Sequence, residues 1–121
     1  PGAPIVWLAH AAKGAGHPRF LPWFEAGRLE RHLFALRRDF HPYGLTAYAL
    51  RWKAARHPVH VVSVLPRDVL RPMGLWVFDD AQAAIDHALG AAERSAADAR
   101  PGATRPLRCI VLPRAAETFF A

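Results

Sequence analysis

Residues that could bind an anion gather near the start of the chain, within one segment of eight residues: His10, Lys13, Gly14, Gly16 and His17. The lysine carries a compact positive charge, and the two glycines permit backbone angles that bring N–H groups close to a ligand. A dinucleotide fingerprint would need a third glycine and an immediate helix, but Arg19 and Pro18 stand there instead. We interpret the segment as an anion-contacting loop or as a simple turn between a strand and a helix.

Three other side chains could do chemistry, but structural roles explain them. Ser63 ends a predicted strand without the glycines of a nucleophile elbow, so we expect it to cap the short helix that begins near Pro66. Asp79 precedes a predicted helix and has Gln82 three residues later, the pattern of a capping box, while Asp80 suits the positive end of the helix dipole.

The histidines, the cysteine and the tryptophans do not form a recognisable site. No two of the seven histidines have the i, i+4 spacing of a zinc-binding helix, and the single cysteine has no partner. We therefore predict no metal site in this chain. Cys109 lies in an apolar run and is expected to be buried, and the four tryptophans are expected to belong to the core rather than to stack on bases.

The elements that must position these residues alternate along the chain. Apolar or β-branched runs predict strands at 4–9, 59–64, 75–78 and 108–112. Helical spacing predicts helices at 20–25, 29–39, 45–56, 67–71 and from Asp79 to about Ala92, followed by a frayed end and loop at 95–106.

This order predicts an α/β fold: one three-layer domain over residues 1–121, with a mostly parallel four-stranded sheet and helices on both faces. Ligands of such sheets bind beyond the carboxyl ends of the strands. That rule selects residues 10–17, 63–66, 78–80 and the segment after Pro113.

Composition narrows the class of protein. The net charge is +6 and fourteen of the sixteen basic residues are arginine, but they are scattered along the chain, which disfavours a nucleic-acid surface. No window has the roughly 18 apolar residues of a membrane helix, so we expect a cytoplasmic protein. The chain begins at Pro1 without methionine, which is consistent with processing or with a fragment of a longer protein.

The order of segments resembles the C-terminal domain of the nickel-pincer lactate racemase family. In that family, a strand leads into a polar Gly-x-Gly-His run and a Phe-containing helix, which is similar to residues 5–9, Lys13 to His17 and Phe20 here. Four later stretches also resemble the family pattern: Val61 to Pro66, Gly74-Leu75, Ala84 to Leu89, and Ile110 to Pro113. The resemblance spans residues 1 to about 119.

The resemblance implies a domain that closes a cleft and positions substrate without being catalytic alone. Family members racemise or epimerise 2-hydroxy acids with a nickel-pincer nucleotide, which is held by an N-terminal domain that has no counterpart here. The C-terminal tyrosine-glutamine-x-x-lysine element would lie upstream of Pro1. The expected partners are that N-terminal domain and a small 2-hydroxy acid. The candidate cleft residues are Lys13, Gly14, Gly16, His17, Thr46 and Ser63. The residue after Gly44 departs from the aromatic or histidine of the family pattern.

Two alternatives remain open. The chain could be a stand-alone, non-catalytic module that holds an anionic metabolite with Gly14 and Gly16. It could also bind nucleic acid weakly through its arginines, with an affinity that falls steeply as salt is added.

Overall fold

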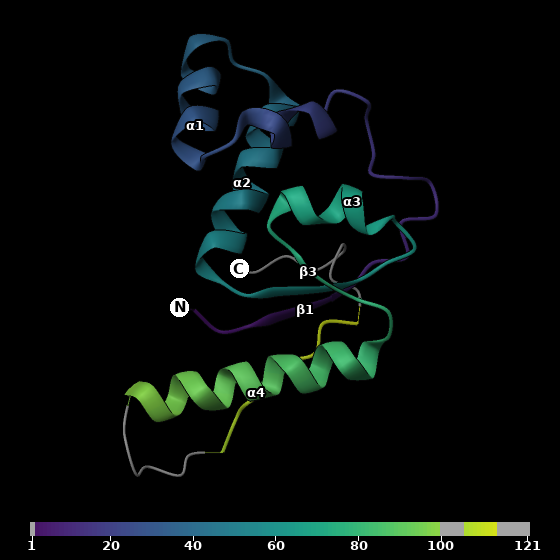
Figure 1. Cartoon of the computed structure of the whole chain (residues 1–121), viewed down its shortest axis with the longest axis vertical. Coiled ribbons are helices and arrows are strands. Elements are labelled where there is room, and N and C mark those ends of the chain that lie inside the picture. Colours follow the sequence, from purple (N-terminus) through teal and green to yellow (C-terminus); the bar gives the residue numbers. More distant parts are fainter. Residues whose placement is uncertain (1, 100–105, 114–121) are drawn as a thin grey trace.

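Three parallel strands form the centre of the computed structural model, which describes residues 2–99 and 106–113 (Figure 1). They are β1 (Ile5–Leu8), β2 (Val59–Val62) and β3 (Trp76–Phe78), in the order β1-β2-β3. The register aligns Trp7, Val61 and Val77 across the sheet. Parallel strands need crossovers, and here each crossover is helical.

Helices cover both faces of this sheet (Figure 1). One face carries η1 (Leu21–Ala26), α1 (Leu29–Arg38), α2 (Pro42–Arg56), α3 (Arg67–Leu70) and η2 (Arg71–Met73). The other face carries α4 (Ala81–Ala99), which contacts all three strands. The predicted α/β class, the parallel strands and the two covered faces are therefore confirmed.

The central strand β2 is the most buried element. Val59 and Val61 are 4% and 1% exposed and join the core on the α2 side, and His60 between them is 0% exposed on the α4 side. Successive strand residues point to opposite faces of the sheet. Val59 and Val61 therefore pack into the core on the α2 side, which we call the upper layer, while His60 points to α4, the lower layer. The core on the α2 side is completed by one residue each from η1, α2, α3 and η2 and by the residue before β3: Phe24, Ala47, Leu70, Met73 and Leu75.

The predicted fourth strand is wrong. Residues 106–113 form no strand in the structure and every one of them is exposed, with Ile110 at 84% and Val111 at 77%. Cys109 is likewise exposed rather than buried. An apolar run has the composition of a strand, but a strand also needs a neighbour with which to form a ladder, and composition does not report that. The helix end predicted within 95–106 lies at Ala99, where α4 ends; residues 100–105 lie outside the described residues.

Two predicted helix starts also need correction. The helix predicted from Leu45 begins at Pro42, because proline suits the first helical turn and the His41 side chain accepts a hydrogen bond from the Tyr43 backbone N–H. For α4, the Ala83 N–H donates to Asp80 Oδ1 at 2.8 Å, so Asp80 rather than Asp79 caps the helix.

The tryptophans do not all belong to the core. Trp7, Trp52 and Trp76 are 45%, 40% and 53% exposed, and only Trp23 packs against the buried cluster. Trp52 instead lies under the Arg56 guanidinium, at 3.7 Å from the ring centroid. Among the described residues, no helix is both long and apolar enough to cross a membrane.

Candidate functional site

The carboxyl ends of β1 and β2 lie side by side. The ladder extends past both strands, because the Ala9 N–H donates to the Val62 carbonyl at 2.9 Å and the Val64 N–H donates to the His10 carbonyl at 3.4 Å. The loop that begins at His10 therefore starts beside Ser63 and Val64. This is the edge at which ligands of open α/β sheets bind.

The loop of residues 10–17 has an unusual backbone. Ala11, Gly14 and Gly16 have φ angles of 51°, 87° and 91°, and the Gly14 N–H closes a turn onto the Ala11 carbonyl at 2.9 Å. A Cβ placed on either glycine would meet no atom within 4 Å, so these positions need glycine for its backbone angle and not for space. Lys13 lies exposed within the turn that this hydrogen bond closes.

The far end of this loop packs against the start of α2. The rings of His17 and Tyr43 are stacked, with centroids 4.2 Å apart and planes within 9°. The Arg19 N–H donates to His17 Nδ1 at 3.1 Å, which fixes the imidazole orientation. His41 lies beside the same tyrosine, at 5.4 Å between ring centroids. Residues 17 and 41–43 thus come together, and of these Tyr43 was not singled out from the sequence.

A buried histidine holds the first turn of α2 in place. His32 is 0% exposed, and its Nε2 lies 2.9 Å from the Gly44 carbonyl. Since a carbonyl only accepts, Nε2 carries the proton and donates, which leaves Nδ1 to accept from Arg51 Nη1 at 3.4 Å. Burial, opposed by the Gly44 hydrogen bond, lowers the pKa of His32 below its ordinary 6.5 and keeps the ring neutral.

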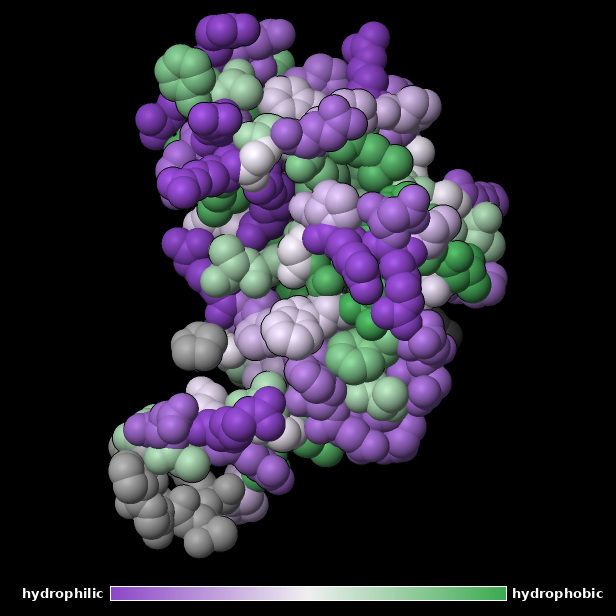
Figure 2. All heavy atoms as spheres, viewed as in Figure 1, coloured by the Kyte–Doolittle hydropathy of each residue, from purple (hydrophilic) through white to green (hydrophobic). Residues whose placement is uncertain are grey.

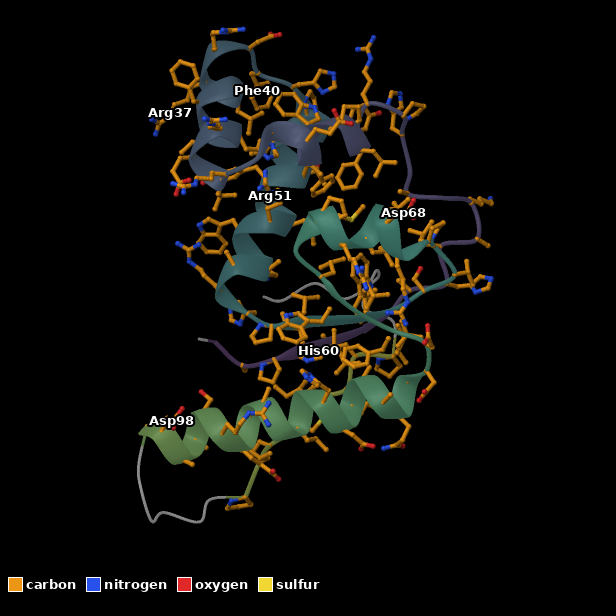
Figure 3. All side chains as sticks on the ribbon, in the orientation of Figure 1. Arg37, Phe40, Arg51, His60, Asp68 and Asp98 are labelled. Carbon is orange, nitrogen blue, oxygen red and sulfur yellow. The ribbon has the colours of Figure 1, made fainter. Side chains whose placement is uncertain are left out.

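Close packing at Gly44 and a second arginine contact complete this support. A Cβ on Gly44 would lie 2.5 Å from the Trp23 ring, and that ring stacks on His32 with centroids 5.2 Å apart. Arg51, labelled in Figure 3, also donates to the Gly27 carbonyl and so ties α2 to the end of η1. The turn that carries Tyr43 and Thr46 is therefore rigidly placed.

The two predicted hydroxyl residues lie near this edge but are engaged locally. Thr46 is exposed, and its Oγ1 donates to the Pro42 carbonyl one turn earlier at 3.2 Å. Ser63 is half-buried, and its Oγ accepts from the Leu65 N–H at 3.2 Å. The expected cap of the helix near Pro66 is therefore wrong, because no side chain caps α3. No hydrogen bond among the described residues joins Thr46 or Ser63 to the 10–17 loop.

The charged side chains in and just after the 10–17 loop are positive. Residues 10–19 contain Lys13 and Arg19 and no aspartate or glutamate. Such an arrangement attracts a carboxylate or a phosphate, with the lysine acting as a point charge. The carboxylate beyond β3, Asp79, is already paired with Arg67 at 2.6 Å.

A second group of histidines lies beneath the sheet and was missed from the sequence. His60, labelled in Figure 3, lies between the sheet and α4. Its Nε2 lies 2.9 Å from His87 Nδ1 on α4, and the rings of Trp76 and Phe78 lie beside the pair. A histidine inside a run of valines is the signal that could have indicated it, because a buried polar side chain needs a partner. Within the described residues, no three histidine, cysteine, aspartate or glutamate side chains converge on a metal position.

Comparison of the chain with protein-family models, with curated proteins and with solved structures finds no match.

Proposed function

We propose that this chain is the cleft-closing and substrate-positioning domain of a nickel-pincer 2-hydroxyacid racemase- or epimerase-like enzyme. It forms one wall of an active site whose reacting groups are carried by another domain, in the same polypeptide or in a separate chain. The proposal places the enzyme in the cytoplasm, where a single exposed cysteine stays reduced.

One observation carries the proposal. The candidate cleft residues 13–17 lie against the start of α2, which carries the candidate Thr46, through the stacked His17 and Tyr43 rings. They are far apart in the sequence and belong to different elements. A wall of a cleft needs such a rigid and composite surface, and the contacts of His32 and Gly44 supply the rigidity.

The chemistry of this wall suits a 2-hydroxy acid. Lys13 offers a positive charge to the substrate carboxylate, and the imidazole of His17 adds a polar edge. Closing such a wall over bound substrate would exclude water and fix the orientation of the carboxylate. Lys13 and His17 are accordingly positioning residues in this proposal, and no reacting group is assigned to the chain.

The proposal routes no step of the reaction through this chain. In the proposal, the nickel and its nucleotide belong to the N-terminal partner domain.

The test uses the chain fused to the N-terminal domain of a lactate racemase, with lactate as substrate. We expect Lys13→Ala to raise KM and to lower kcat/KM about ten-fold, as expected for loss of a charge-assisted contact worth about 1.4 kcal/mol. Lys53→Ala, which removes the other lysine from an exposed position on α2, is the matched control and should leave both constants unchanged.

Two results would count against the proposal. One is an unchanged kcat/KM for Lys13→Ala in an active fusion. The other is nickel retained by the isolated chain at one ion per molecule after purification, because the proposal assigns the metal to the partner domain.

A further inference from the structure

A shallow hollow lies between the short helices α3 and η2 and the edge strand β3. Its volume is about 300 Å³, and it is lined by Arg67, Arg71, Gly74, Leu75, Trp76 and Val77. A second hollow of about 250 Å³ adjoins it at Arg71 and Gly74 and also includes Arg51. Figure 2 shows hydrophilic side chains crossing this face over α3 and β3, with hydrophobic ones exposed between them. None of these residues belongs to the 10–17 loop or to the start of α2.

The two arginines of the first hollow carry charge that the fold does not balance. Arg71 follows Arg67 by four residues, and its backbone N–H donates to the Arg67 carbonyl, so both side chains leave the same side of the helix. Like charges at this spacing repel each other and destabilise a helix. Arg67 has a partner in Asp79, but no carboxylate among the described residues lies within 4.0 Å of an Arg71 nitrogen. Asp68, three residues before Arg71, is the nearest acidic residue along the chain.

The chain reversal after η2 forms the opposite wall. Gly74 has a φ of 82°, which allows the backbone to turn from η2 directly into β3. Leu75, Trp76 and Val77 therefore pass beside the arginines, and the Arg67 Nη1 donates to the Val77 carbonyl at 3.2 Å. Leu75 and Val77 give the hollow an apolar side, whereas the Trp76 ring lies toward α4 beside His60 and His87. An apolar wall strengthens the attraction between a guanidinium and an anion, because it displaces water.

We propose that this hollow binds a phosphate group, either as free phosphate or as the phosphate of a small organic ester. The guanidinium of Arg71 is the main ligand, since its planar donors match two phosphate oxygens at once. Arg67 is the second ligand. Its pairing with Asp79 is exposed, with 45% and 86% of the two side chains accessible, and such pairs contribute little, so Arg67 can share its donors with a ligand. This site is independent of the proposed racemase function.

The test follows the backbone N–H signals of the ¹⁵N-labelled full chain by NMR during titration with inorganic phosphate at constant pH. Sodium chloride at matched ionic strength is the blank. We expect saturable shifts of the backbone N–H signals at residues 74–77. Arg71→Gln should weaken binding about ten-fold, the effect of losing about 1.4 kcal/mol from a charge-assisted hydrogen bond.

Two further variants make the result specific. Asp68→Asn removes the carboxylate nearest along the chain and should tighten binding, whereas Arg38→Gln, at the exposed end of α1, should leave it unchanged. A parallel titration with glycerol 3-phosphate separates the two sources, since tighter binding than phosphate indicates an organic ester. Unaltered affinity in Arg71→Gln, an equal loss in Arg38→Gln, or no saturable shift at residues 74–77 would each overturn the proposal.

Discussion

Each layer around the sheet contains one fully buried histidine, and the two have different partners. His32, above the sheet, bonds to the Gly44 carbonyl and to the Arg51 guanidinium. His60, below it, bonds to the imidazole of His87 and, at 3.4 Å, to the Ile5 carbonyl. Both are 0% exposed, and burial lowers the pKa of both below the ordinary 6.5.

The difference teaches what each region does. The partners of His32 cannot change their protonation near neutral pH, so its tautomer is fixed and the upper layer is a rigid support for the candidate site. His60 shares a hydrogen bond with a second titratable ring, and the positive charge of a protonated His87 further disfavours protonation of His60. Both histidines therefore resist protonation, but His32 supports the loop-bearing layer whereas His60 links α4 to the sheet.

Removing the upper histidine should have the largest effect. His32→Ala deletes a buried ring and leaves the Gly44 carbonyl and Arg51 without their partner, so we expect a loss of about 3 kcal/mol in the free energy of unfolding. Urea unfolding at pH 7.5 measures it. A loss below about 1 kcal/mol would show that His32 does not hold the upper layer.

A pair of Gly→Ala variants in helices compares close packing in the two layers. Gly44→Ala places a methyl group 2.5 Å from the Trp23 ring and should cost about 1–3 kcal/mol, with a change in tryptophan fluorescence. Gly90→Ala on α4 meets only the flexible end of Arg94, at 3.2 Å, and should stabilise by about 0.5–1 kcal/mol. Equal effects in the two helices would contradict the difference between the layers.

The pH dependence should follow both histidines. Because their folded-state pKa values are lowered, the unfolded chain binds protons more readily, and stability is full above about pH 6.5 and falls as the pH drops below it. Each histidine contributes a slope of at most about 1.4 kcal/mol per pH unit. Urea unfolding between pH 7.5 and pH 5 measures the total slope.

Two variants show how much of that pH dependence comes from His60. His60→Phe keeps an aromatic ring beside Trp76 and Phe78. It should lower the slope of unfolding free energy against pH by up to about 1.4 kcal/mol per pH unit, the contribution of one proton. Val61→Ala, at the neighbouring buried position, should lower stability by a similar amount at every pH without changing the slope. If His60→Phe leaves the slope intact, His60 does not contribute to the pH dependence.

The smallest effects concern the start of α4. Asp80→Ala removes the side chain that accepts the Ala83 N–H and should cost about 1 kcal/mol. Asp79→Ala breaks only an exposed ion pair and should cost at most about 0.5 kcal/mol. Thermal unfolding of both variants at pH 7.5 compares them, and a larger loss for Asp79→Ala would reverse the assignment of the cap.

The sequence predicted the class and order of elements well where local patterns decide them. The run Val59 to Val62 indicated a buried strand, and glycines at 14, 16 and 74 marked turns with positive φ. Residues 108–112 have a similar composition, yet they form no strand, because ladder formation depends on a neighbouring edge. Local pattern is therefore a good guide to β2 and a poor one to the end of the chain.

The position of the candidate loop was predicted from the sequence, but its contacts were not. Lys13, Gly14, Gly16 and His17 do form the loop beyond β1, and His17 does meet the start of α2. Tyr43, His32 and the His60–His87 pair escaped prediction because each depends on contacts between elements remote in the sequence. The prediction that Asp79 caps α4 failed for the same reason, because Asp79 instead accepts a hydrogen bond from Arg67 of α3.

The rate at which L-lactate converts to D-lactate tests the central claim most directly. It is measured for three proteins: this chain alone, the N-terminal domain of a lactate racemase alone, and the fusion of the two, each supplied with the nickel-pincer nucleotide. The proposal predicts conversion by the fusion at least about ten-fold faster than by either part, since a closed cleft positions the substrate. Conversion by the chain alone, or a fusion no faster than its N-terminal domain, would contradict it.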